Sequence, residues 1–324
     1  MAGGKAGSPP VDRAARAEID ALWDFADPAA TEGRFRALVP EAEAAGDRAF
    51  HAELLSQLAR THSLRGEFEA AHRLLDEAEV LLDGEPTADA LRARVRCLLE
   101  RGRCHNSAGD RQAAVPLFWS AFEEARDAQL DVYTVDAAHM LGIAERPERR
   151  LAWNLAALAL ARASADERAR RWQGTLHNNI GWEHHEAGRF DEALAHFQAG
   201  WDFRRDDAPA AEGTRVAKWT VARCLRSLGR TPEALAMGRE LVAEVEDLGR
   251  EDGFVCEEMA ECLLALGEAE EAAAWFARAH RSLKDVDWLA RGEPERLARL
   301  AVLGGVSAGD IVTHPTEAND DHSG

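Results

Sequence analysis

The sequence predicts an all-α fold, a solenoid of antiparallel helix pairs. Three observations predict it: a composition typical of helices, a turn segment that recurs along the chain, and small residues at matching places beside that turn. Of the 324 residues, 46% are hydrophobic and 30% are charged, so the chain can bury a core and solvate a surface. Aromatic residues amount to 6% and tyrosine occurs once, which favours helices rich in Ala, Leu, Glu and Arg over strands.

The recurring turn has a glycine at its start and an alanine five residues later. Five copies follow one another at intervals of about 40 residues, except that one interval is two periods long. Glycine suits the left-handed residue that ends a helix, and alanine lets the next helix pack closely. The copies are Gly66–Ala71, Gly109–Ala114, Gly188–Ala193, Gly229–Ala234 and Gly267–Ala272.

Aligning the units on that glycine brings further positions into register. Seven residues before the glycine, or before the equivalent place in a degenerate unit, the residue is always small: Ala59, Gly102, Gly142, Gly181, Ala222 and Ala260. Nine residues after it, large apolar side chains recur, with Gly238 as the one misfit: Leu75, Phe118, Phe197 and Phe276. This pattern over residues 49–283 resembles the tetratricopeptide repeat family. The resemblance implies a right-handed superhelical solenoid of about six repeats, with units longer than the family's usual 34 residues.

The elements follow in order from this register. An irregular helix pair is expected within residues 12–46, with helices at Ala15–Phe25 and Ala29–Ala45, and a capping helix at 293–303. The third unit is degenerate and turns at Arg146-Pro147. We expect one solenoid over residues 12–304, with polar, disordered tails at 1–11 and 305–324. The repeat units are expected near 49–83, 90–128, 132–164, 168–204, 212–248 and 251–283.

The charge balance excludes some partners. The net charge is −19 and the isoelectric point about 5.1, so an acidic surface would repel a phosphate backbone, and we expect no nucleic-acid partner. No apolar run is long enough to cross a membrane and no secretory signal is visible. We therefore expect a cytoplasmic protein without a membrane partner, whose five cysteines are reduced and structural.

Histidines are the candidate metal ligands. His177 and His184 are seven residues apart on one predicted helix, and His139 lies one unit earlier, so a three-ligand site is conceivable. Against it, His62, His105 and His184 fall at the same repeat position, which a structural role explains. No compact metal motif is present, and we expect no cofactor.

The resemblance implies that the first helix of each unit lines a concave groove. In the middle units the groove positions are basic and aromatic, although the whole chain is acidic. Arg can hold a carboxylate and Trp can cover apolar groups. An alternative is that Trp182 and Trp219 pack on each other while the arginines pair with neighbouring glutamates. The candidate groove residues are Arg60, Arg103, His139, Asn178, Trp182, His185, Trp219, Arg223 and Arg226.

The leading functional interpretation is a non-catalytic scaffold that binds a protein or peptide segment, acidic or with a free carboxylate, in this groove. Relatives clamp a peptide carboxylate with Asn, Lys and Arg; Asn178 or Asn179 resembles the clamp Asn, but the Lys partners are absent. The second interpretation is a regulatory module that senses a small anionic ligand in the groove. The third is a metal-dependent enzyme with a histidine-rich site.

Overall fold

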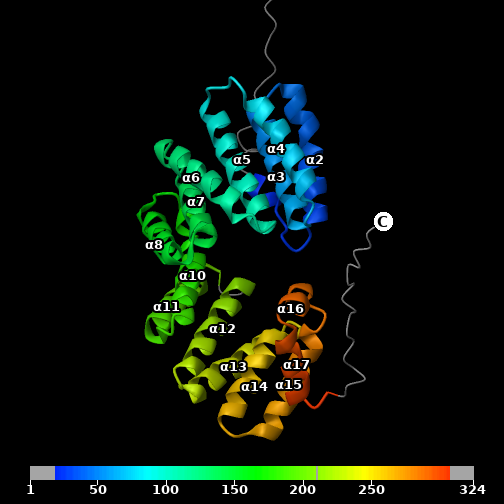
Figure 1. The fold of residues 1–324 in the computed structure, drawn as a ribbon, viewed down its shortest axis with the longest axis vertical. Coiled ribbons are helices and arrows are strands. Elements are labelled where there is room, and N and C mark those ends of the chain that lie inside the picture. Colours follow the sequence, from blue (N-terminus) through cyan, green and yellow to red (C-terminus); the bar gives the residue numbers. More distant parts are fainter. Residues whose placement is uncertain (1–18, 209–210, 307–324) are drawn as a thin grey trace, which may run out of the picture. The chain divides into compact units, whose positions relative to one another are not determined.

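The structure is a computed structural model that describes residues 19–208 and 211–306. Throughout these residues the regular structure is helical and no strand occurs, which confirms the all-α prediction (Figure 1). The chain divides into two compact units, Met1–Ile180 and Gly181–Gly324, and the division falls within α10 (Gln173–Glu186). The single array expected over residues 12–304 stays a prediction.

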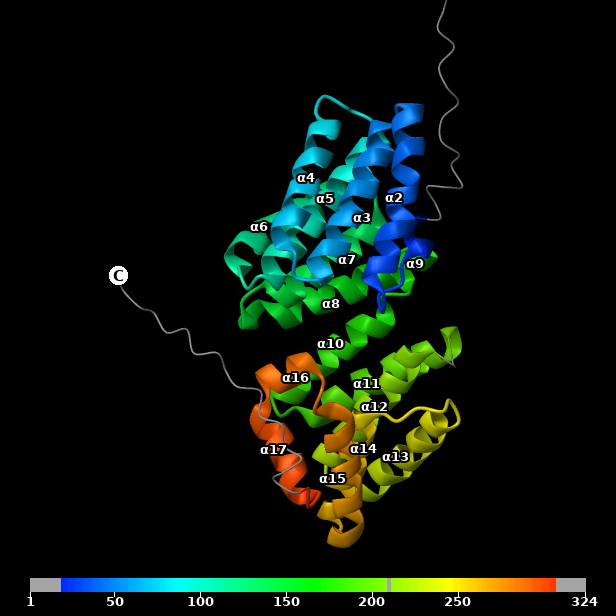
Figure 2. The ribbon, with the colours of Figure 1, turned by 90° about the vertical axis from the view of Figure 1, so that its right-hand side faces the viewer.

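Unit 1 consists of helix pairs joined by short turns. In α3/α4, α5/α6 and α7/α8 the two helices pack on each other, and the first helices α3, α5 and α7 also contact one another in turn (Figures 1 and 2). This is the stacking that the repeat pattern predicts. The elements are η1 (Ile19–Leu22), α2 (Pro28–Ala45), α3 (Arg48–Leu64), α4 (Phe68–Leu82), α5 (Ala88–Ser107), α6 (Arg111–Asp127), α7 (Asp131–Ala144), α8 (Pro147–Ala163) and α9 (Glu167–Arg170).

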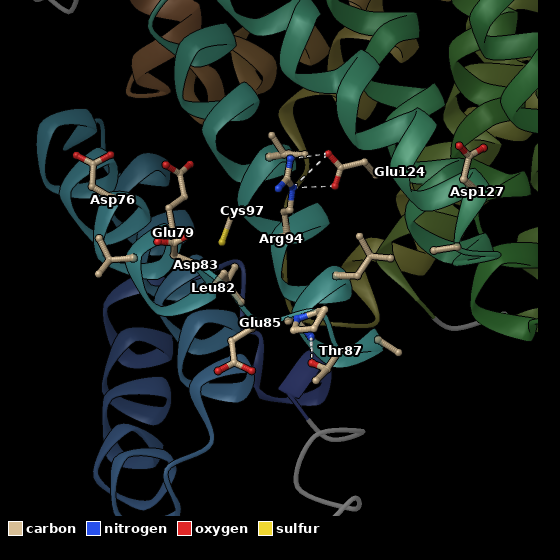
Figure 3. A pocket seen from close by; sticks show the side chains of 18 residues that line it. Asp76, Glu79, Leu82, Asp83, Glu85, Thr87, Arg94, Cys97, Glu124 and Asp127 are labelled. Atoms are coloured by element: carbon tan, nitrogen blue, oxygen red, sulfur yellow. Dashed lines mark hydrogen bonds and ion pairs between the residues drawn. The ribbon is translucent and has the colours of Figure 1, made fainter.

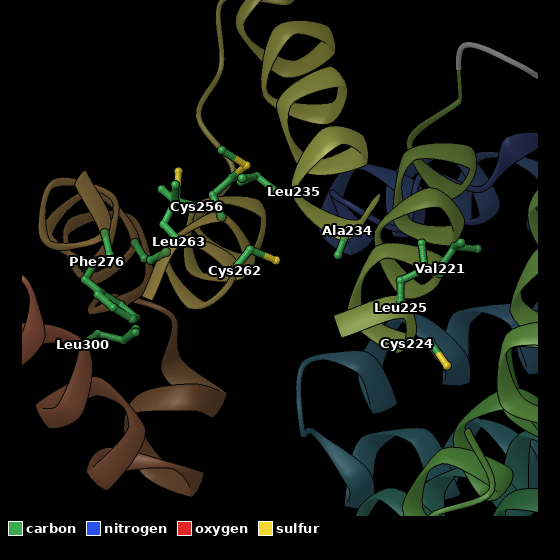
Figure 4. Packing of buried hydrophobic residues seen from close by; sticks show 14 of the residues in the cluster. Val221, Cys224, Leu225, Ala234, Leu235, Cys256, Cys262, Leu263, Phe276 and Leu300 are labelled. Carbon is green, nitrogen blue, oxygen red and sulfur yellow. The ribbon is translucent and has the colours of Figure 1, made fainter. Parts of the chain in front are cut away.

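Unit 2 continues the same construction. The helices α12 and α14 are the first helices of their pairs and contact each other, while α17 packs on α15. Phe276 and Leu263 lie in the buried core of this unit with Leu300 of the last helix (Figure 4). The elements are α11 (Phe190–Asp207), α12 (Glu212–Ser227), α13 (Thr231–Glu246), α14 (Gly253–Ala265), α15 (Ala269–Leu283), α16 (Asp287–Gly292) and α17 (Pro294–Leu303).

The turn glycines have the backbone conformation that the sequence predicts. Gly66 and Gly188 adopt φ values of 77° and 73°, in the left-handed region that favours glycine. The amide of Gly66 donates to the carbonyl of Ser63, and the next amide, of Glu67, donates to that of His62. These bonds satisfy the last carbonyls of α3, so each turn ends one helix and aims the next.

Small residues before the turn make room for large ones after it. A Cβ atom added to Gly102 would lie 2.5 Å from the ring of Phe118, and one added to Gly181 would lie 2.5 Å from the ring of Phe197. Both rings are almost completely buried. The two recurring positions in the sequence are therefore the two halves of one helix–helix contact.

This contact yields a matched pair of stability predictions. Gly102→Ala should lower the free energy of unfolding by about 1–3 kcal/mol, because the added methyl group overpacks the Phe118 contact. Gly33→Ala should instead raise it by roughly 0.5–1 kcal/mol, because Gly33 is exposed within α2 and an added Cβ meets nothing within 4 Å. Urea unfolding followed by circular dichroism measures both, and equal effects would contradict the packing argument.

The predicted first helix, Ala15–Phe25, is wrong within the described residues. Only Ile19–Leu22 is helical there, as a short 3-10 turn. The Asp24 carboxylate accepts from the Ala26 amide. The hydroxyl of Thr31 accepts from the Asp24 amide and donates to the Asp24 carbonyl. These local bonds stabilise a turn in place of a continuing helix. Asp27 then caps α2.

Three further expectations concern the chain ends, membrane crossing and the cysteines. The tail at 1–11 lies outside the described residues, as does the tail at 305–324 from residue 307 onward. No described helix combines the length and apolar character that crossing a bilayer requires. The five cysteines are free and buried, and burial raises the pKa of Cys97, Cys256 and Cys262 to about 12, so these thiols are poor nucleophiles.

Candidate binding site

Four aromatic side chains of unit 2 form a continuous row. Neighbouring ring centroids lie 6.2 Å apart for Trp182 and Trp219, 6.3 Å for Trp219 and Phe254, and 6.1 Å for Phe254 and Trp288. The rings come from α10, α12, α14 and α16, one from each. We call these four residues the aromatic row.

The row is half-buried along most of its length and open at its end. Trp182, Trp219 and Phe254 are partly buried, and the Trp219 indole N–H donates to the carbonyl of Phe254 at 3.2 Å. Trp288 is 57% exposed, and Val216, which lies one turn before Trp219 on α12, is 48% exposed. The rings are held in place by their neighbours while their outer faces remain available for contact.

An ion-pair cluster lies beside the row. Arg226 holds Glu258 with two bonds, of 2.5 Å and 3.1 Å, whereas Arg223 lies 3.8 Å from the same carboxylate. Glu258 is 4% exposed; burial raises the pKa of its carboxyl, and Arg226 acts against that rise. Both parts of the alternative interpretation are thus seen here: Trp182 and Trp219 contact each other, and Arg226 is paired within the chain. Arg223, one-third exposed, is the less engaged cation.

His185 packs against Trp182, the first ring of the aromatic row. Its Nε2 lies 2.9 Å from the Ser227 hydroxyl, and its ring packs edge-on against Trp182 and Phe190. Burial lowers the pKa of His185, and Arg226 lowers it further. The residue is therefore a neutral packing element at physiological pH.

In unit 1 the predicted groove arginines are bound by carboxylates. Arg60 donates to Glu100 at 3.0 Å, and Arg103 contacts both Glu100 at 2.7 Å and Asp136 at 2.5 Å. Glu100 is buried between the two arginines. The result is a chain of alternating charges across α3, α5 and α7, with no surplus of free positive charge at these residues.

The histidines considered as metal ligands have other partners. His139 is buried and its Nδ1 lies 3.2 Å from the Asn179 side chain. His177 lies 2.9 Å from Arg162, and His184 accepts from Arg189. Within residues 19–208 and 211–306, no three His, Cys, Asp or Glu side chains are placed to hold a metal ion. The three candidate histidines are therefore not brought together as one ligand set within these residues, and the third interpretation stays a hypothesis.

Asn178, by contrast, has an unsatisfied group. Its side-chain oxygen is buried and has no hydrogen-bond donor in the structure, which is a costly state for a polar atom. Asn178 belongs to unit 1 and Trp182 to unit 2. The clamp role that the resemblance suggests for Asn178 stays a prediction.

The environment of His139 predicts a pH dependence of stability. Burial lowers the pKa of His139 from 6.5 to about 4, so between these values the unfolded chain binds a proton that the folded chain does not, and stability falls as pH falls. Between pH 7 and pH 5 this should cost about 2 kcal/mol of unfolding free energy. Urea titrations at the two pH values should show that loss in the natural chain and a smaller one in His139→Gln; equal losses would refute it.

Unit 1 also has an acidic cleft of about 1450 Å³, which the sequence pattern did not predict. Its floor is α5, and carboxylates from the C-terminal parts of α4 and α6 lie on its two sides (Figure 3). Several are paired: Arg94 holds Glu124, and Arg101 holds Asp76 and Glu79.

Trp288 of the aromatic row was also not predicted from the sequence, because it lies between the last repeat and the capping helix, where the repeat register assigns no position.

Comparison with known proteins agrees with the fold. Residues 51–78 match the family model of the tetratricopeptide repeat, and no curated protein sequence matches the chain. A signal-transduction ATPase with numerous domains and a tetratricopeptide repeat sensor, from Pyrococcus horikoshii, is similar in structure (TM-score 0.62, 14% identity), over 88% of this chain and 46% of that one. The apo form of RapI is similar at a TM-score of 0.65 and 9% identity, over 91% and 80% of the two chains. The chain thus spans less than half of the Pyrococcus structure, and these likenesses concern the fold.

Proposed function

We propose that this tetratricopeptide repeat protein binds a peptide or protein segment along the aromatic row of unit 2. The observation that carries the proposal is the row itself. Its four rings come from the three consecutive first helices α10, α12 and α14 and from the short α16, lie 6.1 to 6.3 Å apart, and end in an exposed tryptophan. Aromatic rings held rigidly at a surface give large contact area at small cost in conformational entropy, and they dominate the energetics of protein interfaces.

The chemistry of the bound segment follows from what borders the row. Apolar side chains would cover Trp219, Phe254 and Trp288, and a carboxylate would approach Arg223, whose own partner lies 3.8 Å away. Arg226 already holds Glu258 with two hydrogen bonds, so its main role would be to hold the cluster in place. Apolar contact therefore supplies most of the affinity, and Arg223 selects for an acidic group.

The same balance of charge argues against the second interpretation, a small anionic ligand. A compact anion gains most from several free cations that converge on it, whereas Arg226, Arg60 and Arg103 are each engaged by a carboxylate. A polypeptide can use the whole length of the row, which a small molecule cannot.

Selection from a displayed random peptide library tests the proposal. The purified chain serves as bait, and Trp288→Ala serves as a counter-bait, because an exposed side chain can be truncated without loss of the core. We expect enriched peptides with two or more large apolar residues near a carboxylate, which the counter-bait binds at least tenfold more weakly. Peptides that bind both baits equally, or no enrichment at all, would refute the site.

A further inference from the structure

A short segment at the start of the described chain lies across the first helices of unit 1. We call Ile19–Phe25 the strap. The Trp23 indole N–H donates to the Gln57 side chain on α3 at 2.8 Å. Asp20 accepts from Arg96 on α5 at 2.5 Å. The strap therefore bridges α3 and α5 through one polar bond to each helix.

The strap covers residues that the repeat register assigns to the groove. The Arg60 guanidinium lies 5.7 Å from the ring of Trp23 and 5.5 Å from that of Phe25, which stack on each other. Asp20 lies 4.0 Å from Arg168 of α9 as well as against Arg96. The chain's own segment thus indicates the chemistry that suits this face. A carboxylate lies between the guanidinium groups of Arg96 and Arg168, and two aromatic rings lie beneath that of Arg60.

The strap is held by its apolar side chains, while two of its other side chains stay exposed. Leu22 and Trp23 pack, partly buried, against the core of unit 1, and the ring of Trp23 lies 5.4 Å from that of the buried Phe35. Ile19 is buried in the core of unit 1, whereas the Asp20 side chain is 48% exposed and Phe25 is 61% exposed. The contacts of Asp20 and Phe25 therefore lie at the surface, where each is worth little alone.

Arg96 would keep its position without Asp20. Arg96 also donates to the Tyr133 hydroxyl at 2.7 Å and lies 3.2 Å from Glu53. These two contacts fix the guanidinium on α5 independently of Asp20. Release of Asp20 would therefore free one side of a guanidinium group that its other contacts hold in position.

We propose that the face of α3 and α5 is a second binding site, which the strap occupies in this structure and which accepts a partner segment with the same chemistry. That segment carries a carboxylate, an aromatic side chain three residues later and a second aromatic two residues after that, as Asp20, Trp23 and Phe25 do. The site belongs to unit 1 and does not depend on the aromatic row. Because the strap is tethered, it competes at a high effective concentration, so a free segment binds well only when the strap is weakened.

The test uses a labelled peptide with the sequence of the strap, Ile-Asp-Ala-Leu-Trp-Asp-Phe, and fluorescence anisotropy. The full chain with Asp20→Ala and Trp23→Ala should bind it at least tenfold more tightly than the natural chain. A peptide with Lys in place of its first Asp should not bind. Because the strap peptide also has the composition expected of ligands for the aromatic row, the comparison is repeated with Trp288→Ala present in both chains. The tenfold difference should persist in that background, so failure of this site and failure of the aromatic row give different results.

Hydrogen–deuterium exchange on the natural chain gives a second readout that needs no variant. Added strap peptide should speed exchange of residues 20–25 while α5 remains protected. The proposal is overturned if the double variant is folded by circular dichroism yet does not bind the peptide. It is also overturned if residues 20–25 of the natural chain exchange only with global unfolding, since the strap would then be a fixed cap.

Discussion

Trp219→Ala should weaken the binding of a selected peptide by about 2 kcal/mol or more, some thirtyfold in Kd. Trp219 lies in the interior of the aromatic row, with Trp182 on one side and Phe254 on the other. Truncation removes the contact area of Trp219 and its ring contacts with both neighbours. It also removes the hydrogen bond from its indole N–H to the carbonyl of Phe254. Isothermal titration calorimetry against a library-selected peptide measures the loss.

Two controls separate binding from folding. Trp275→Ala removes a tryptophan of the same unit that lies on α15, outside the row, where Arg278 stacks on it at 4.3 Å; this variant should bind normally. Trp219→Phe keeps a ring in the row and should recover part of the affinity. If Trp275→Ala weakens binding as much as Trp219→Ala, then the loss reflects the stability of unit 2, and the row is not the site.

The repeat register explains how much of the fold the sequence revealed. A turn glycine such as Gly66 and a small residue such as Gly102 are determined by local backbone geometry and by one contact within a helix pair. Both requirements recur in each unit. A pattern that repeats can be recognised by comparing the chain with itself. The N-terminal strap and Trp288 occur once each, outside the repeats, so no such comparison could place them.

The pairing of charges at the groove positions follows the repeat period. Pairing of the groove arginines with neighbouring glutamates was one of two alternatives, and it named no partner; Glu258 is the partner of Arg226. The partners of Arg60, Arg103 and Arg226 follow them in the chain by 40, 33 and 32 residues, which is about one repeat. In a stacked array such residues are neighbours. An acid one period after an arginine is therefore a signal of pairing, and only Arg223 lacks a close contact of this kind.

Arg226→Leu should lower the free energy of unfolding by about 3 kcal/mol, because it leaves the buried Glu258 carboxylate without its two-bond partner. Arg223, at 3.8 Å, compensates only in part. The double variant Arg226→Leu/Glu258→Leu should recover much of that loss, because it leaves no buried charge unpaired. Urea unfolding of the two variants and the natural chain measures these differences.

The loss in Arg226→Leu should also depend on pH in a definite direction. Burial already raises the pKa of Glu258, and removing Arg226 raises it further, since the pairing cation opposed that rise. Between the ordinary pKa of a glutamate and the raised one, the folded chain holds a proton that the unfolded chain has released. Stability therefore falls as pH rises through this window. The variant should consequently be closer to the natural chain in stability at pH 5 than at pH 8. A difference that is the same at both values, or larger at pH 5, would show that Glu258 is not the uncompensated charge.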